Sequence, residues 1–277
     1  MHTYLYETHE KHLFDPLLPF VFHKDTVRKS DAFGSPNWHR NIELLCCVSG
    51  RGTAKCNAVP YPMEPGDVLV INADVMHSMR ALHPQEPFVY HCLIIDEQFC
   101  HENGVQTELL QFTPLIRDPE LFHAFERLVL CFAQYLESKA LPQMLEIRHC
   151  VLGILCTLCS RYLHGQIPPE EHRSHQRVKE VVTFLRQNLA SDLSLDEISA
   201  NIGISKFHLS REFKSATGMT VIEFLNLSRC AEAKRLIENG ASVSEAAGSC
   251  GFTNMSYFCR LFKRHFGFPP STYIVKK

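Results

Sequence analysis

Apolar residues in the first third of the chain come in short runs that Gly and Pro interrupt, which is the pattern of β-strands. From Phe20 onward, the clearest run covers residues 42–48 and leads into turn residues at 49–52. Further runs lie at 53–57, 68–71, 77–80 and 88–95, and a break is expected at 60–62, where two prolines stand. Short strands at this spacing indicate a sandwich or a barrel.

From Pro114 the apolar spacing changes to three and four residues, which indicates helices. One amphipathic helix is expected around residues 121–132, and a second from Pro142 to Leu163. The second is apolar over more of its circumference than packing on one face of a sheet requires, and a surplus apolar stripe favours a protein partner. The alternative is a helix buried inside its own domain.

Residues 165–176 form the expected linker between two domains. Two consecutive prolines there exclude a helix, and the surrounding polar residues have nothing to bury. Apolar residues at helical spacing between Val178 and Leu189 then predict an opening helix. The predicted organisation is a first domain at 1–164, the linker, and a second domain at 177–277.

A repeat organises the second domain. Residues 194–205 match residues 242–253 at a constant offset of 48 positions. Matching Leu, Phe, Arg, Lys and Gly positions between 209–218 and 258–267 follow at an offset of 49. One supersecondary unit is therefore used twice.

Each copy of the repeat predicts a helix-turn-helix. A Ser followed three residues later by a Glu forms a capping box that begins a short helix in both copies. Gly203 and Gly251 then tolerate the left-handed backbone that ends this helix, and Ser205 and Thr253 can cap the next one. The second helix of such a motif is the one that enters the DNA major groove.

A long helix is expected to join the two units. A third capping box at Thr220 begins it, and it ends near Asn239. At 1.5 Å per residue this helix is about 28 Å long. That is close to the ~34 Å between successive major-groove faces on one side of B-DNA, so one duplex can meet both second helices.

The helical wheel assigns the side chains that reach DNA. In the first unit these are Lys206, Phe207, Ser210, Arg211 and Lys214, and in the second they are Asn254, Met255, Ser256, Cys259, Arg260, Lys263 and Arg264. Arg211 suits two hydrogen bonds to a guanine edge. Phosphate contacts, which position the domain without reading sequence, suit Lys214, Lys263, Arg264 and His265. The alternative for Arg211 and Arg260 is pairing with acids such as Glu212 or Glu232.

Charge is divided unevenly along the chain. The formal net charge is −2, but from Arg173 onward 15 Lys+Arg stand against 9 Asp+Glu, while the residues before it carry 13 against 21. A basic half joined to an acidic half indicates nucleic acid as the partner of the basic half.

The twelve cysteines lie inside apolar runs, and no signal-like segment begins the chain, so they indicate reduced core residues of a cytoplasmic protein. Cys156 and Cys159 have the spacing of a redox pair but lie in an apolar helical run. No apolar run reaches the ~18 residues that a membrane span needs, so no membrane association is expected.

Residues from about 174 to 277 resemble the DNA-binding domain of the AraC/XylS family of bacterial transcription regulators. The resemblance is carried by residues 195–200, 205–214, 229–236 and 246–252, and by the closing stretch 257–273 with its Gly-x-Pro-Pro-x-x-Tyr-like ending. Two helix-turn-helix units in one chain are far more specific than one.

Residues 20–96 resemble a cupin, a small β-barrel found as the sensor domain of many AraC-type regulators. The resemblance implies a small-molecule effector, such as a sugar or another metabolite, and the candidates for its pocket are Trp38, His39, Glu43 and His77. The alternative for Trp38 is a packing role. His39, Glu43 and His77 also match three of the four metal ligands of metal-binding cupins, but Asn37 stands at the fourth place. Replacing an imidazole by a carboxamide weakens such a site, so no metal or other cofactor is expected.

The predicted fold is therefore a cupin-like β-barrel with two amphipathic helices, followed by an all-α domain with two helix-turn-helix units. The predicted function is that of an effector-responsive, sequence-specific transcription regulator, with activation favoured over repression. It is expected to act in the bacterial cytoplasm as a homodimer through helices around 115–164, with RNA polymerase as a further partner. The alternatives are a metal-dependent cupin enzyme with a DNA-binding appendage, and a thiol-based redox regulator that uses Cys46, Cys47 or the Cys156/Cys159 pair.

Overall fold

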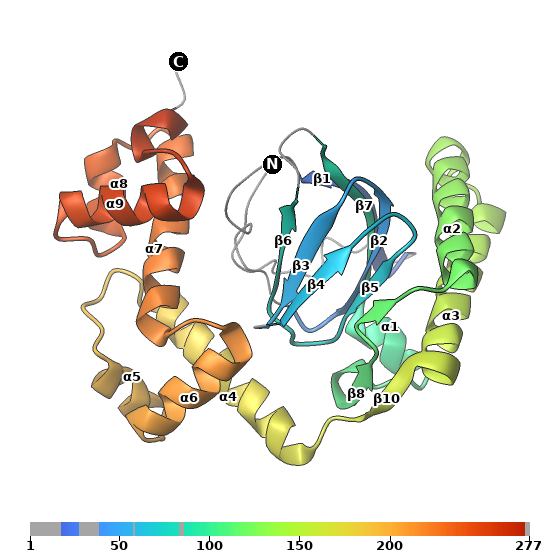
Figure 1. Ribbon diagram of the computed structural model, residues 1–277, viewed down its shortest axis with the longest axis horizontal. Helices are drawn as coiled ribbons and strands as arrows, with labels where there is room; N and C mark the ends of the chain where they lie inside the picture. The colour runs from blue at the N-terminus through green and yellow to red at the C-terminus, as the bar shows by residue number, and fades with distance from the viewer. Residues whose placement is uncertain (1–17, 28–38, 58, 83–85, 275–277) are drawn as a thin grey trace. The chain divides into compact units, whose positions relative to one another are not determined.

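A computed structural model describes residues 18–27, 39–57, 59–82 and 86–274, without the side chains of 169, 171 and 172. These residues form two compact units that divide between Pro168 and Pro169. The first unit is rich in β-strands and carries helices, and the second is entirely helical, as the sequence predicts (Figure 1).

Two antiparallel sheets form the body of the β-rich unit (Figure 1). The larger one has the order β1 (Phe20–Val27), β7 (Phe88–Ile95), β2 (Ile42–Ser49), β5 (Val68–Ile71) and β9 (Leu115–Ile116). The smaller one has the order β4 (Val59–Met63), β3 (Gly52–Cys56) and β6 (His77–Ala81). A two-stranded sheet pairs β8 (Leu110–Phe112) with β10 (Leu163–Gln166).

Strand β2 is buried on both faces, because it lies between two cores. Leu44 and Cys46 belong to the core that the helices cover, whereas Leu45 and Cys47 belong to the core between the two sheets. Successive side chains of a strand point to opposite faces. This alternation places Glu43 on the same face as Leu45, toward the space between the sheets.

The described strands form separate sheets rather than one closed barrel. Residues 60–62, where a break was expected, instead lie inside β4, which among the described strands pairs with β3 alone. Proline has no N–H to offer a further strand, so prolines are accepted at a sheet edge. Pro60 and Pro62 therefore end the smaller sheet without interrupting its outer strand.

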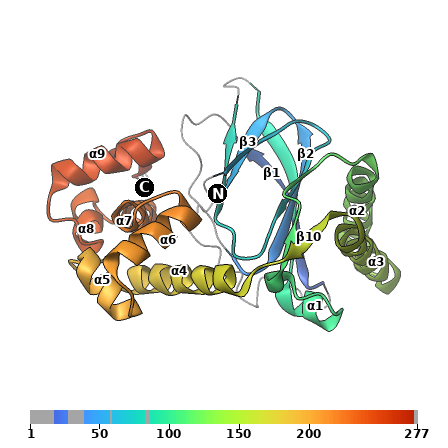
Figure 2. The same cartoon turned by 60° about the horizontal axis from the view of Figure 1, so that its bottom comes forward.

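Two long helices cover the outer face of the larger sheet. These are α2 (Pro119–Ser138) and α3 (Leu141–Thr157), which lie side by side in Figure 2. A π-helical turn, η3 (Leu158–Tyr162), continues α3, and shorter helices α1 (Glu97–Glu102) and η2 (Thr107–Leu109) precede α2. The inner residues of α2 and α3 complete the core behind β2.

The stretch Leu141–Tyr162 is long and apolar enough to cross a membrane, the one such helix in the described part of the chain. An apolar run of this length was not expected from the sequence. Its inner side chains, among them Ile147 and Val151, are buried in the core of the β-rich unit. Core helices commonly have this composition, so the run alone is weak evidence for a membrane span.

The helical unit contains α4 (Pro169–Gln187), α5 (Leu195–Ile202), α6 (Lys206–Thr217), α7 (Val221–Glu238), α8 (Val243–Ser249), α9 (Met255–Phe266) and η4 (Pro270–Tyr273). Part of the expected linker 165–176 is therefore helical. The prolines do not prevent this, because α4 begins at Pro169, and a proline at the first helical position lacks only an N–H that has no helical partner there. The domain limits 1–164 and 177–277 remain predictions.

Candidate DNA interface and ligand site

Capping residues set the limits of the helices that carry the DNA-binding motifs. Both hydrogen bonds of a capping box are present at Ser194, Thr220 and Ser242, as predicted. Ser205 caps α6, but Asn254 rather than Thr253 caps α9, with its Oδ1 accepting from the Tyr257 N–H at 2.9 Å. The side-chain oxygen of Asn254 is therefore engaged in the cap.

Two helix-turn-helix units lie at the two ends of α7 (Figure 1). Helices α5 and α6 form the first, and α8 and α9 form the second. Leu209 and Phe213 of α6 are buried, as are Phe258 and Phe262 of α9, which confirms the inward face predicted for both helices. The 18 residues of α7 span about 27 Å at 1.5 Å per residue.

Most side chains predicted to meet DNA from α6 face solvent. Phe207 is 77% exposed, and Arg211 and Lys214 are also exposed, while Ser210 is half-buried. Lys206 forms an ion pair with Asp196 at 3.0 Å. Both partners of this pair are largely exposed, so it contributes little to stability and leaves Lys206 at the surface.

The second unit presents the set predicted for it around α9. Asn254, Met255, Ser256, Arg260, Lys263 and Arg264 are exposed, and Cys259 is half-buried. The wheel did not single out Tyr257, whose hydroxyl accepts a hydrogen bond from the Asn226 amide at 3.2 Å. Its ring lies 5.6 Å from the guanidinium of Arg260, one of the residues predicted to reach DNA.

The acids near the two arginines have other partners. Glu212 pairs with Arg177, and Glu232 pairs with Arg235. In the part of the chain that the structure describes, neither Arg211 nor Arg260 takes part in an ion pair. The arrangement favours a DNA-directed role for both arginines over intramolecular pairing.

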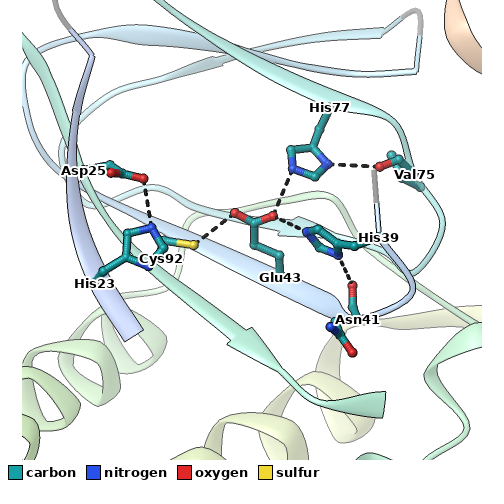
Figure 3. Close-up of polar contacts among 8 residues, drawn as sticks. All are labelled: His23, Asp25, His39, Asn41, Glu43, Val75, His77 and Cys92. Atoms are coloured by element: carbon teal, nitrogen blue, oxygen red, sulfur yellow. Dashed lines mark hydrogen bonds and ion pairs between the residues drawn. The ribbon is translucent and has the colours of Figure 1, made fainter. Parts of the chain in front are cut away.

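In the β-rich unit, two of the predicted pocket residues, His39 and His77, converge on the carboxylate of a third, Glu43 (Figure 3). Glu43 Oε2 lies 2.8 Å from His39 Nε2 and 3.0 Å from His77 Nε2. All three side chains are at least nine-tenths buried. The fourth residue, Trp38, lies outside the described residues.

Backbone carbonyls define the hydrogen positions of both imidazoles. His39 Nδ1 lies 2.9 Å from the carbonyl oxygen of Asn41, and His77 Nδ1 lies 3.0 Å from that of Val75 (Figure 3). A carbonyl only accepts, so each Nδ1 carries a hydrogen and donates it. Two states of each imidazole then allow Nε2 to contact Glu43. In an imidazolium, Nε2 carries a second hydrogen and donates it to the carboxylate. In a neutral imidazole, the lone pair of Nε2 and the carboxylate bind the same cation.

Glu43 is held ionised in this cluster. Burial alone would raise the pKa of its carboxyl, but the electrostatic attraction and hydrogen bonds of His77 and His39 outweigh burial and lower the pKa well below its ordinary value. Cys92 of β7 also donates its thiol hydrogen to Glu43 Oε1 at 3.0 Å (Figure 3). The alternation of β7 puts Cys92 on the inner face with Tyr90 and Ile94, but its contact with Glu43 depends on the register between β2 and β7.

His39, Glu43 and His77 can also hold a divalent transition metal. One donor atom of each lies within 4.8 Å of the others. Metal-binding histidines usually donate their other ring N–H to a carbonyl or carboxylate, as both histidines do here. Asn37, which stands at the fourth place, lies outside the described residues. A second group, Glu97, His101 and Glu108, is more exposed and includes an ordinary surface pair.

Three of the four cysteines of the redox alternative are poorly suited to thiol chemistry. Burial raises the pKa of both Cys46 and Cys47 to about 12. Burial also raises the pKa of Cys159. The reactive species is the thiolate, so these three thiols are largely protonated at neutral pH.

Known protein families match both the β-rich unit and the helical unit. Residues 27–147 match the AraC-like ligand binding domain family, and residues 198–275 match a helix-turn-helix domain family. The HTH-type transcriptional activator RhaR of Escherichia coli (strain K12) is 25% identical over 241 residues, which cover 84% of each chain. ToxT from Vibrio cholerae, a solved structure, has a TM-score of 0.54 and 14% identity over 92% of this chain and 97% of ToxT. That likeness concerns the fold.

A ligand-binding domain followed by a helix-turn-helix domain defines a class of DNA-binding transcription regulators that carry their own sensor. The chain belongs to the AraC family within this class. It is a transcription regulator and not an enzyme.

Proposed function

We propose that this regulator is a transcription activator controlled by a small metabolite, such as a sugar, that binds between the two sheets of the β-rich unit. In this proposal the two sheets form a cupin-like sensor domain, and Trp38, His39, Glu43 and His77 contact the effector. The description of RhaR as an activator supports activation rather than repression. Promoter DNA and RNA polymerase are the expected macromolecular partners in the bacterial cytoplasm.

The buried cluster around Glu43 is the observation that carries this proposal. Its neighbours on the same face of β2, Leu45 and Cys47, are fully buried and apolar. A buried ionised carboxylate with two imidazoles contributes little net stability compared with a packed apolar side chain. Its presence inside a core is therefore better explained by recognition of a polar ligand, whose hydroxyl groups can exchange hydrogen bonds with the carboxylate and the imidazoles.

A homodimer through α2 and α3 is the proposed assembly. Leu130 and Leu136 of α2 are 63% and 64% exposed, and Leu141 and Leu145 of α3 are 63% and 53% exposed. Large apolar side chains gathered on one pair of helices favour a protein contact. The inner faces of the same helices are already packed in the core, so the exposed leucines are available to a second copy.

The test is to identify what the purified full chain binds. Protein expressed in bacteria would be denatured, and the released small molecules identified by mass spectrometry, alongside a Glu43→Gln variant prepared in the same way. We expect one polar metabolite in the wild-type sample that is strongly depleted in the variant, and that alters operator binding when added back. Equal small-molecule content in both samples, with no compound that changes DNA binding, would contradict the proposal.

A metal-dependent sensor is the second candidate, because both histidines already have the ring orientation that metal ligation requires. Elemental analysis of the same two samples decides this point. Close to one equivalent of Zn²⁺ or Fe²⁺ in the wild type, absent from Glu43→Gln, would favour the metal. A metal-free wild type that still binds the metabolite would exclude it.

A further inference from the structure

An acidic side chain lies next to the first predicted base-reading arginine. Glu212 follows Arg211 on α6. A carboxylate directed at DNA would repel the phosphates, but Glu212 is held against the protein instead. Its side chain is only 12% exposed.

Three side chains meet at this carboxylate. Arg177 of α4 donates to both of its oxygens, with the Nε contact to Oε2 at 2.9 Å and an NH2 contact to Oε1. His208 Nε2 lies 2.9 Å from Oε1, and the Ser174 hydroxyl also forms a hydrogen bond with Glu212. The hydrogen bond from Arg177 is the largest of the effects that lower the pKa of Glu212. The carboxylate is therefore ionised and fully engaged.

Apolar packing sets only the approximate orientation of α6. Buried Leu209 and Phe213 direct one face of α6 inward, but hydrophobic burial is non-directional and does not fix the exact rotation of α6 about its own axis. A two-point contact between a planar guanidinium and a carboxylate has a fixed geometry. Because one helical residue corresponds to about 100° of rotation, fixing Glu212 also fixes the direction of its neighbour Arg211.

We propose that Arg177 and Glu212 form a positioning pair that sets the orientation of α6 and thereby the base discrimination of the first helix-turn-helix. Neither residue reads DNA itself. The inference rests on the proposed role of Arg211 in base reading. It also makes α4, the helix that enters the DNA-binding unit from the β-rich unit, the element that orients the first reader.

The test is a double-mutant cycle with the full-length chain. Binding of wild type, Arg177→Gln, Glu212→Gln and the double variant is measured on duplexes that the wild type selects from a random library, and on a scrambled duplex. The ratio of the two affinities cancels the change in net charge. We expect each single variant to lose about tenfold in this ratio, the order of one good base contact. The double variant should lose no more than the worse single variant, because the pair acts as a unit.

Matched variants separate this role from charge and from general destabilisation. Arg173→Gln removes the same charge one turn earlier, from a pair with Glu170 in which both side chains are exposed, and should keep the wild-type ratio. Arg177→Lys keeps the charge without the two-point contact and should stay impaired. The proposal would be overturned if the losses of the two single variants added up in the double variant, or if Arg177→Lys kept the wild-type ratio of affinities. Glu212→Gln, which preserves side-chain shape, carries the test if Arg177→Gln does not fold.

The second readout is which base positions of the duplex lose discrimination. Arg177→Gln should relax the same base positions as Arg211→Ala and leave those read by the second unit unchanged, whereas a merely destabilised domain would weaken all positions alike. If Arg211→Ala itself kept wild-type discrimination, the assignment of the first reader would be wrong. If Arg211→Ala lost discrimination and the variants of the pair did not, only the positioning role would be wrong.

Discussion

Two kinds of basic residue lie on the DNA-binding unit, and the structure separates them by location. Arg211 lies in the middle of α6, on its exposed face, whereas Lys263 lies in the last turn of α9. A guanidinium in the middle of a reading helix suits a base edge, and a lysine near the end of a helix suits a phosphate.

Substitution of these two residues should therefore have different effects. Arg211→Ala is expected to reduce operator discrimination by about tenfold, the cost of one base contact. Lys263→Ala should weaken binding to all duplexes and flatten its salt dependence by about one unit of slope. Fluorescence anisotropy over a range of salt concentrations, with selected and scrambled duplexes, measures both effects. The same phenotype in both variants would contradict the assignment of roles.

Glu43 should affect stability in a pH-dependent way. Its pKa is lowered in the folded state by His77 and His39, against the opposing effect of burial. A lowered folded pKa gives stability that is present above the unfolded pKa, about 4.3, and is lost as pH falls from there toward the folded value. Glu43→Gln should cost about 3 kcal/mol at pH 7, because it leaves the buried imidazoles without their charged partner.

Urea unfolding at pH 7 and at pH 4 measures this contribution. The wild type should lose more stability between the two pH values than Glu43→Gln does. Glu126→Gln is the matched control, because Glu126 pairs with His123 at an exposed position and should behave like the wild type. If the wild type and Glu43→Gln lost the same stability on acidification, the buried carboxylate would not be the group responsible.

At the scale of elements, the two helix-turn-helix units share a pattern but differ in packing at the turn glycine. Gly203 and Gly251 both have a left-handed backbone, with φ of 77° and 80°. A Cβ at Gly203 would meet open space, whereas a Cβ at Gly251 would lie 2.8 Å from the carbonyl oxygen of Leu189. That oxygen also accepts a hydrogen bond from Arg229 at 2.7 Å, so it cannot move freely.

Alanine at these two glycines should therefore have unequal costs. Gly203→Ala is expected to destabilise the unit by about 1 kcal/mol, the backbone cost of a left-handed residue with a side chain. Gly251→Ala should cost about 3 kcal/mol, because overpacking adds its own term. Chemical denaturation followed by far-UV circular dichroism measures both values. Equal costs would show that the turn adjusts without disturbing Leu189.

The elements that local pattern predicted correctly are those with strong local signals. The capping boxes, the left-handed glycines and the apolar spacing of α6 and α9 depend on residues within a few positions of one another. The beginning of α4 at Pro169 and the course of β4 through Pro60 were mispredicted. In both cases the effect of proline depends on whether its missing N–H has a partner, and that is decided by the position in the helix or sheet.

At the scale of the whole molecule, the exposed leucines of α2 and α3 predict self-association. Leu145→Asp should shift the sedimenting species from a dimer to a monomer of 31.7 kDa. The physical reason is that a charge introduced into an apolar interface must be desolvated without a partner. Analytical ultracentrifugation measures the shift.

Leu82→Asp is the control for this substitution, because Leu82 is an exposed leucine of the β-rich unit outside both helices. It should leave the assembly unchanged. A monomeric wild type, or a Leu145→Asp variant that remains dimeric, would remove the proposed interface.

The sequence by itself determined the two-part organisation, the repeated helix-turn-helix and the residues on its outer face, because helical period, caps and glycine turns are local properties. It also indicated His39, Glu43 and His77 as one group through a family resemblance. Only the tertiary structure decided that the two Nδ1 hydrogens go to carbonyls, that Cys92 joins Glu43, and that Arg177 engages Glu212. These contacts join residues whose pairing depends on strand register and helix packing, which no local pattern encodes.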